Sequence, residues 1–329
     1  MRSEDVVIVG AGFAGAATAW ALRERGIRAT VLEREASVGV HASGRGAGLG
    51  RVLAEDDATS QLTIRGAELL RERFGTFWKQ TGGFLTFEDV QVAEDYRARA
   101  RRFDVPHEMV ERGVVRKHWS IEVPMEAVMF VPGDGVIDNG GLLQAYAVDA
   151  ELGVAVRRIS ASTRGAVIET DRGAIEARCV VDGSGAWAGS WTQDPPLEAF
   201  KRHLFVVEIA AAAEAPYLWH VGERELYVRP HADGVLACPC DAERVEARSQ
   251  EPSSDADARC EARLPGSVIL KRWACQRAFA PDRKMRIGRD ADRPWLVWAA
   301  ALGGHGATAS AAVGERAAAA VMEVLDDRA

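Results

Sequence analysis

The sequence predicts an α/β fold that begins with a Rossmann-type nucleotide-binding unit and continues with a second, mainly antiparallel sheet. Within residues 5–34 a glycine-rich turn stands between a short apolar strand and a helix. A long helical stretch is predicted at 62–78, where an NAD-type dehydrogenase would continue with further short strand–helix units. Strand-like segments follow at 83–87 and 127–131, and they indicate a different kind of sheet.

The composition is that of an ordinary globular enzyme. Of 329 residues, 47% are apolar, and the net charge of −7 comes without a Lys/Arg-rich block, so we expect no nucleic-acid partner. No apolar run reaches membrane-spanning length, and the first strand begins close to Met1, so we expect a cytoplasmic protein without a signal peptide. Five cysteines, an odd number, indicate reduced thiols. Cys238 and Cys240 have no His or Cys at ligand spacing, so no metal site is predicted.

The strongest signal is a G-x-G-x-x-G motif between the first strand and the first helix. Its first glycine permits a tight turn, its second lets the backbone approach a pyrophosphate, and its third lets the helix pack closely on the strand. These three residues are Gly10, Gly12 and Gly15. Glu33 stands about twenty residues further on, at the tip of the second strand, where a carboxylate accepts a hydrogen bond from a ribose hydroxyl. The unit therefore predicts a bound dinucleotide.

The loop HASGRGAGLGR at 41–51 follows this unit and has almost no residue that would build a core. Backbone without large side chains can run flat against a broad planar ring. The loop therefore favours a flavin over a nicotinamide.

With this loop, the chain resembles the FAD-dependent D-amino acid oxidase superfamily, which includes glycine and sarcosine oxidases and D-amino acid dehydrogenases. The form H-A-S-G-R is most similar to the D-arginine dehydrogenase-like branch. Four later stretches fit the same pattern in the right order: GDGVIDNGGLLQAY (133–146), VVDGSGAWAGSW (180–191), QRAFAPDRKMRIGRD (276–290) and WLVWAAALGGHGATAS (295–310).

The resemblance implies a Rossmann-type FAD-binding domain and a discontinuous substrate domain built on a mainly antiparallel sheet. We expect the FAD-binding domain at 1–82, 133–200 and 282–329, and the substrate domain at 83–132 and 201–281. Residues 246–265 are polar and Pro/Ser-marked, so we expect an exposed connection plus a helix there, and no site.

By the same resemblance, loop 41–51 lies along the flavin, and the helix after the terminal glycine loop points its positive end at the flavin pyrimidine edge. We expect FAD to be held without a covalent bond. The residues expected to bind it are Gly10, Gly12, Phe13, Ala14, Gly15, Glu33, Arg34, His41, Ala42, Ser43, Gly44, Arg45, Gly46, Ala47, Gly48, Gly183, Gly185, Trp187, Cys275, Gly303, Gly306, Ala307 and Thr308.

The resemblance also implies which residues hold an amino-acid substrate. Arginine binds a carboxylate through a bidentate fork, and Arg277 matches the superfamily's carboxylate-binding arginine. Tyr227, in LYVRP, matches a tyrosine that assists the same carboxylate. Arg202, in KRHLF, matches a second arginine of the D-arginine dehydrogenase-like branch. Gly304 is expected to offer its carbonyl to the substrate amine.

Three other side chains keep open roles. His305 would line the pocket or hydrogen-bond the flavin, and His41 would lie near the flavin N5 edge. Arg51 matches an arginine that contacts the substrate carboxylate in the sarcosine oxidase branch, so it competes with Arg277 as the anchor.

The chain departs from the branches it resembles at three positions. Gly50 stands where the D-arginine dehydrogenase-like branch has a lid tyrosine, so a preference for D-arginine does not follow. Cys275 stands where the sarcosine oxidase branch bonds covalently to the flavin, so a covalent bond remains an alternative. Leu236 replaces a lysine that activates O₂ in that branch. Without that charge superoxide is poorly stabilised, which favours a dehydrogenase that passes electrons to a quinone or dye over one that uses O₂.

The function implied is oxidation of the C–N bond of an amino acid, with a D-amino acid as the first expectation. Hydride transfer to flavin N5 would give an imine, which water hydrolyses to a 2-oxo acid and ammonia. The alternatives are sarcosine oxidase-like oxidation of N-methyl or secondary amino acids, and a non-catalytic flavin-binding protein. An NAD(P)H-using flavoprotein would need a second G-x-G-x-x-G motif, which the sequence lacks.

Overall fold

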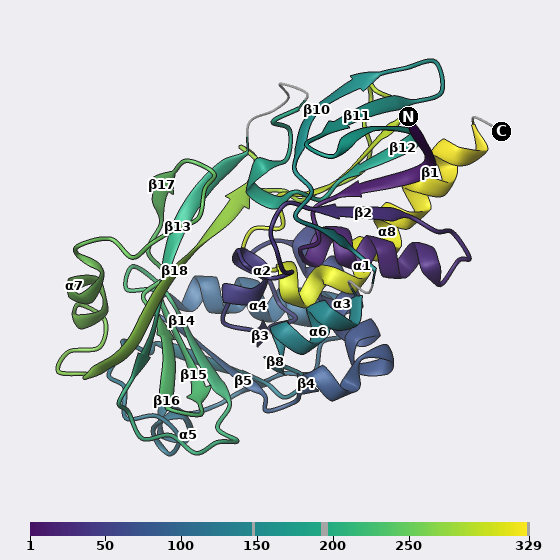
Figure 1. Cartoon of the computed structure of the whole chain (residues 1–329). Helices are drawn as coiled ribbons and strands as arrows, with labels where there is room; N and C mark the ends of the chain where they lie inside the picture. The colour runs from purple at the N-terminus through teal and green to yellow at the C-terminus, as the bar shows by residue number, and fades with distance from the viewer. Residues whose placement is uncertain (147–148, 192–196, 328–329) are drawn as a thin grey trace.

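The computed structural model describes residues 1–146, 149–191 and 197–327. Figure 1 shows a sheet covered by helices on one side of the molecule and a second, curved sheet on the other. The two ends of the described chain lie near each other, at the upper right of the view.

The first sheet has eight strands within the described residues, and its centre is parallel. Its main path runs β10 (Val156–Ala161), β11 (Ala166–Thr170), β12 (Gly173–Asp182), β1 (Arg2–Val9), β2 (Thr30–Glu33) and β9 (Glu151–Leu152). Off this path, β20 (Leu296–Ala300) pairs in parallel with β12, and β19 (Arg286–Arg289) pairs with β20. Residues 6–9 of β1 are buried on both faces, as their unbroken apolar run predicts.

Helices pack in this half of the molecule, and the first of them begins within the glycine motif. The helices of this half are α1 (Phe13–Arg23), α3 (Asp57–Arg73), α6 (Asn139–Tyr146) and α8 (Gly306–Asp326). Helix α8 packs against both α1 and α3. The helix predicted at 62–78 begins earlier and ends earlier than expected. Asp56 caps α3 by accepting a hydrogen bond from the Thr59 backbone N–H at 2.9 Å, and a separate turn, η1 (Gly75–Phe77), follows.

The second sheet has nine strands in the described part of the chain, and all of its pairings except one are antiparallel. Its path is β17 (Glu243–Val245), β13 (Glu198–Val207), β16 (Gly234–Cys238), β15 (Leu226–His231), β14 (Tyr217–Val221), β5 (Gly83–Phe87), β7 (Ala127–Val131) and β6 (Glu108–Met109). The long strand β18 (Ile269–Phe279) pairs with β13, and β14 runs parallel to β5. Strands of this sheet therefore come from 83–131 and 198–279.

Smaller elements join the two sheets. A three-stranded sheet contains β3 (Leu49–Gly50), β8 (Gly135–Ile137) and β4 (Trp78–Lys79). The remaining helices are α2 (Ala42–Arg45), α4 (Val90–Arg102), α5 (Arg112–Arg116) and α7 (Ala256–Glu261), with a further turn at η2 (Gly185–Trp187). Helix α7 is the helix expected within 246–265. None of the helices in the described ranges has the length and apolar character needed to cross a membrane.

A buried carboxyl group ties three of these segments together. Asp134 is fully buried, accepts a hydrogen bond from the Val52 backbone N–H at 3.0 Å and accepts another from the Tyr217 hydroxyl at 2.5 Å. Burial raises the pKa of Asp134 to about 7, although both hydrogen bonds oppose this rise. Its charged form is therefore disfavoured in the folded state.

We predict that Asp134→Asn flattens the dependence of stability on pH. Because the folded pKa lies above the unfolded one, the contribution of Asp134 is fully present below about pH 4 and is lost as the pH rises through 7. The amide of the variant cannot ionise, so between pH 5 and pH 8 the unfolding free energy of the variant should rise by about 2–3 kcal/mol relative to that of the natural protein. Denaturant unfolding at several pH values measures this. The exposed Asp292→Asn variant is the control, and equal slopes for both variants would contradict the prediction.

We also predict that Gly15→Ala destabilises the packing of α1 on β1. A Cβ atom at Gly15 would lie 1.9 Å from the carbonyl oxygen of Gly10, so the helix must move away from the strand. The expected loss is about 1–3 kcal/mol, which thermal unfolding detects. In the control Gly113→Ala, on α5, the added methyl group meets open space. A loss no larger than that of the control would show that the close approach is unimportant.

Candidate active site

One cavity of about 760 Å³ lies between the two sheets. The carboxyl ends of β1, β2 and β12 border it from one side, and strands β13, β14, β15 and β18 border it from the other. The expected site residues that line it are Gly10, Gly12, Phe13, Ala14, Glu33, Arg34, His41, Ala42, Ser43, Gly46, Ala47, Gly48, Arg51, Gly183, Gly185, Trp187, Arg202, Tyr227, Cys275, Arg277, Gly303, Gly304, His305, Gly306, Ala307 and Thr308. Residues far apart in the sequence therefore share one chamber.

The glycine turn forms the wall at the start of α1. Gly10 has a φ of +93°, which a residue with a side chain rarely adopts. The Ala11 N–H donates to Glu33 Oε2 at 2.8 Å, and the Phe13 N–H donates to Ser43 Oγ at 3.0 Å. The side chains of Glu33 and Ser43 thus accept hydrogen bonds from the backbone of the turn, and both residues were predicted to belong to the same site. Gly15 does not line the cavity and acts from behind the turn.

The acidic tip of β2 gathers a polar cluster. His41 Nε2 lies 2.9 Å from Glu35 Oε1, and its ring packs on Trp187 with centroids 4.8 Å apart. The Arg34 guanidinium stacks over the same Trp187, at 4.2 Å from the ring centre. His41 was expected near the flavin N5 edge. These contacts place it beside the tip of β2 that ends in Glu33.

The loop at 42–48 is only partly irregular, because its first four residues form helix α2. Arg45 ends this helix and donates to the backbone carbonyls of Gln250 and Ala274, both at 3.2 Å. Trp273 Nε1 donates back to the Arg45 carbonyl at 2.9 Å. Gly44 and Arg45 were expected to bind the cofactor. Neither is among the residues that line the cavity, and the Arg45 guanidinium joins the loop to β18 through its hydrogen bond with the Ala274 carbonyl.

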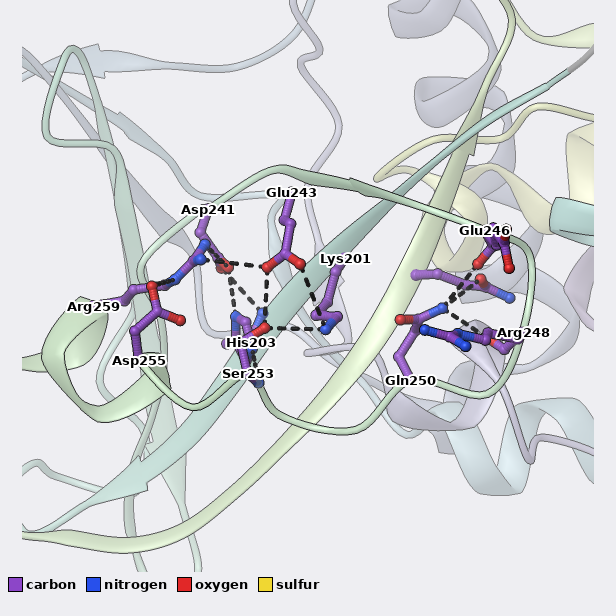
Figure 2. Close-up of polar contacts among 11 residues, drawn as sticks. Lys201, His203, Asp241, Glu243, Glu246, Arg248, Gln250, Ser253, Asp255 and Arg259 are labelled. Atoms are coloured by element: carbon purple, nitrogen blue, oxygen red, sulfur yellow. Dashed lines mark hydrogen bonds and ion pairs between the residues drawn. The ribbon is translucent and has the colours of Figure 1, made fainter.

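The segment between β17 and α7 is fastened to β13 by a buried histidine (Figure 2). His203 Nδ1 lies 2.5 Å from Asp241 Oδ2, and Nε2 accepts a hydrogen bond from the Ser253 backbone N–H at 2.9 Å. Gln250 lies further back on the same segment, and its carbonyl accepts the hydrogen bond from the arginine that ends α2. Through the Gln250 carbonyl, this segment contacts Arg45 in the loop at 42–48.

The wall formed by the second sheet carries arginine and tyrosine side chains. Arg277 Nη2 donates to the Tyr227 hydroxyl at 3.0 Å. Arg202 is paired with Cys275 across β13 and β18, and its Nε and Nη1 atoms are buried without a hydrogen-bond partner in the described structure. The structure thus brings together the three residues predicted to hold a carboxylate.

Arg51 is a second positively charged group, and it lies beside the terminal glycine loop. Arg51 Nη2 donates to Glu55 Oε1 at 2.9 Å and lies 3.3 Å from His305 Nε2. The Arg51 guanidinium stacks on Trp219 at 3.4 Å from the ring centre. Its Nη1 atom is buried without a partner among the described residues. Glu55 and Trp219 belong to no recognisable motif, so they were not predicted from the sequence.

The terminal loop brings backbone close to the arginine on β18. A Cβ atom at Gly304 would lie 2.9 Å from Arg277 Nη1, and Gly303 has a φ of +55°. Thr308 Oγ1, in the first turn of α8, donates to the Leu49 carbonyl at 3.0 Å. The loop, the start of α8 and β3 therefore form one continuous side of the cavity.

The absence of a lid tyrosine at Gly50 has a structural reason. A Cβ atom there would lie 2.6 Å from the Trp78 ring. A larger residue at this point would have to displace the Trp78 ring, so the departure from the D-arginine dehydrogenase-like branch matches the packing around β3 and β4.

Thiols near the arginine side chains have shifted pKa values. Burial raises the pKa of Cys275 to about 11, and the charge of Arg277 offsets only part of this rise. For Cys238, burial also favours the neutral form. A hydrogen bond with Cys240 and the charges of Arg202 and Arg277 outweigh burial and lower the pKa of Cys238. In the described chain, no group of three or more His, Cys, Asp or Glu side chains is arranged to hold a metal ion.

The chamber fits the FAD that the family resemblance implies. Gly10 and Gly12 line the cavity without side chains of their own, and Glu33 lines it as well. Asn139 Oδ1 is buried without a partner in the described structure, while its Nδ2 donates to the Gly46 carbonyl at 3.1 Å. A buried acceptor without a partner is expected to accept a hydrogen bond from a bound group. Asn139 gave no signal in the sequence because its role depends on the loop that lies across it.

Comparisons with known proteins show the family to which the chain belongs. A family model described as "DAO: FAD dependent oxidoreductase" matches residues 5–320. Monomeric sarcosine oxidase of Streptomyces avermitilis is 25% identical over 94% of this chain and 91% of its own. The tRNA 5-methylaminomethyl-2-thiouridine biosynthesis bifunctional protein MnmC of Thiobacillus denitrificans is 28% identical over 94% of this chain, and the match spans only 55% of that protein.

Solved structures show the same fold. L-proline dehydrogenase from P. horikoshii superposes with a TM-score of 0.87 at 22% identity, covering 98% of this chain and 94% of that one. Glycine oxidase from Geobacillus kaustophilus gives 0.82 at 22% identity, with 98% and 95% covered. The family model spans nearly the whole sequence and both halves of the cavity, and the chain therefore belongs to the DAO family of FAD-dependent oxidoreductases.

Proposed function

We propose that the protein oxidises the C–N bond of an amino acid, with a D-amino acid as the first candidate. The observation that carries the proposal is the pairing of Arg277 with Tyr227 in the cavity that also holds the glycine turn. Bound FAD would supply the hydride acceptor, and the imine product would hydrolyse to a 2-oxo acid and ammonia. The names of three relatives, sarcosine oxidase, glycine oxidase and L-proline dehydrogenase, support chemistry at a C–N bond.

In this proposal the second sheet holds the substrate carboxylate. Arg277 and Arg202 donate to it, and the Tyr227 hydroxyl adds a third donor. Buried guanidinium groups are costly without an anion, so their open N–H groups favour a carboxylate ligand. Gly304 lies against Arg277 and also lines the cavity. Its carbonyl would accept a hydrogen bond from the substrate amine and hold the amine toward the first sheet.

Two alternatives follow from other observations. Arg51 also lines the cavity with an open N–H group, which supports sarcosine oxidase-like oxidation of N-methyl or secondary amino acids. A non-catalytic flavin-binding protein would need none of these donors. For electron transfer we propose a dehydrogenase that passes electrons to a quinone or dye, with O₂ as the slower acceptor, because Leu236 is an apolar, buried residue.

The division into domains and the compartment remain part of the proposal. We assign FAD binding to 1–82, 133–200 and 282–329, and substrate binding to 83–132 and 201–281, because the strands of the two sheets follow nearly these ranges. The five free cysteines support a reducing compartment such as the cytoplasm.

We predict that Arg277→Met weakens binding of an amino acid or an amine-free carboxylic acid about 100-fold, because a buried charged partner is worth about 2–5 kcal/mol. Flavin absorbance titrations of the purified protein measure the dissociation constant, and flavin content should stay unchanged. Arg65→Met, at an exposed position on α3, is the matched control. If the two variants bind equally well, the carboxylate site lies elsewhere and the non-catalytic alternative gains ground.

We further predict that FAD is released when the protein is precipitated with acid. A thiolate is the reactive form of cysteine, and burial keeps the Cys275 pKa near 11, so the thiol stays protonated at neutral pH. The supernatant should carry the yellow colour, for the natural protein and for Cys275→Ala alike. The covalent alternative would be established if flavin stays in the precipitate of the natural protein but is released from the precipitate of Cys275→Ala.

A further inference from the structure

The cavity offers more donors than one carboxylate can accept. A carboxylate has two oxygens with about four acceptor positions. Arg202 leaves Nε and Nη1 open, and Arg277 with Tyr227 adds further donors on the same wall. These three side chains satisfy one carboxylate. Arg51 Nη1 is a further buried donor without a partner in the described structure.

Arg51 faces the same chamber from a neighbouring position. Its guanidinium stacks on Trp219, and Trp219 on β14 is the direct cross-strand partner of Tyr227 on β15. Paired residues of adjacent strands lie about 5 Å apart. His305, which contacts Arg51, follows Gly304, whose Cβ position lies against Arg277. Two short chains of contacts therefore connect Arg51 to Arg277, one through Trp219 and Tyr227 and one through His305 and Gly304.

The charges around these anchors leave this end of the chamber positive. Glu55 binds Arg51 and His305, and Glu225 accepts a hydrogen bond from Trp219 Nε1 at 3.0 Å. These two carboxylates offset two of the three guanidinium groups, those of Arg51, Arg202 and Arg277. One positive charge is left, and the exposed Arg283 adds another. A zwitterionic amino acid with one carboxylate carries no net charge, whereas one with two carboxylates is an anion.

We propose that the substrate carries two carboxylates flanking its amine, as an acidic amino acid or an imino dicarboxylic acid does. One carboxylate binds Arg277, Arg202 and Tyr227, and the second binds Arg51 on its face away from Glu55. This inference rests on the proposed function and narrows its substrate class. Trp219 positions Arg51 by stacking, and Glu55 limits its movement.

Binding of two non-oxidisable acids tests the second anchor without turnover. Succinate and butyrate have chains of equal length and differ by one carboxylate. Titration calorimetry of the FAD-loaded protein should give a dissociation constant for succinate at least about 30-fold lower than for butyrate, equivalent to about 2 kcal/mol. Removing the Arg51 charge together with its partner, in Arg51→Met/Glu55→Gln, should abolish this difference. Arg51→Lys should retain part of it, and the control Arg65→Met all of it.

Anaerobic bleaching of the flavin separates failure of this inference from failure of the proposed function. Reduction by aspartate, glutamate or iminodiacetate, faster than by alanine or sarcosine, is the expected result. If alanine or sarcosine alone bleaches the flavin, and succinate binds no better than butyrate, the inference is overturned while the proposed function stands. If no amino acid bleaches the flavin, both fall. Loss of FAD from the Arg51 variants would assign Arg51 to the cofactor and also overturn the inference.

Discussion

Burial of guanidinium groups against an open chamber is the constraint on which the site depends. The Nε and Nη1 atoms of Arg202 are buried without a partner in the described structure, and Arg277 donates to the Tyr227 hydroxyl. Transferring such a group from water without an anionic partner costs several kcal/mol. The paired strands β13 and β18 fix both side chains through their register, with Arg202 opposite Cys275 and Phe200 opposite Arg277. The fold therefore stabilises an arrangement that an anion would complete.

The glycine-rich loop joins this anion site to the nucleotide-binding unit. Ser43 accepts from the first N–H of α1, and Arg45 at the other end of α2 reaches the carbonyl of Ala274 on β18. One short segment thus touches both sheets. Behind it, the network around His203 and Gln250 holds the segment between β17 and α7 in place (Figure 2). These contacts join the two sides of the chamber through one segment.

The sequence predicted the parts of the site whose roles are local. Gly10, Gly12 and Glu33 lie within one strand–helix–strand unit, and the spacing alone determines how they meet. Arg277 and Tyr227 were predicted only through resemblance, because they lie on strands far apart in the sequence. The contacts of His41 with Glu35 and Trp187 could not be predicted from a motif, because they depend on how the loop folds against two other segments.

Other features of the structure could not be predicted from a single sequence. Asp134 looks like one more turn residue, and its burial depends on Val52 and Tyr217, which come from two other segments. Trp219 stacks on Arg51 only because β14 lies beside β15 and faces the chamber. The start of α3 was misplaced because Asp56, an ordinary acidic residue in the sequence, acts as its cap.

The most direct measurement of the central claim is a crystal structure of the FAD-loaded protein with a carboxylic acid bound. We expect a carboxylate within hydrogen-bond distance of both the Arg277 guanidinium and the Tyr227 hydroxyl, inside the chamber that holds the flavin. A carboxylate bound elsewhere, or an Arg277 side chain turned away to a protein carboxylate, would contradict the claim.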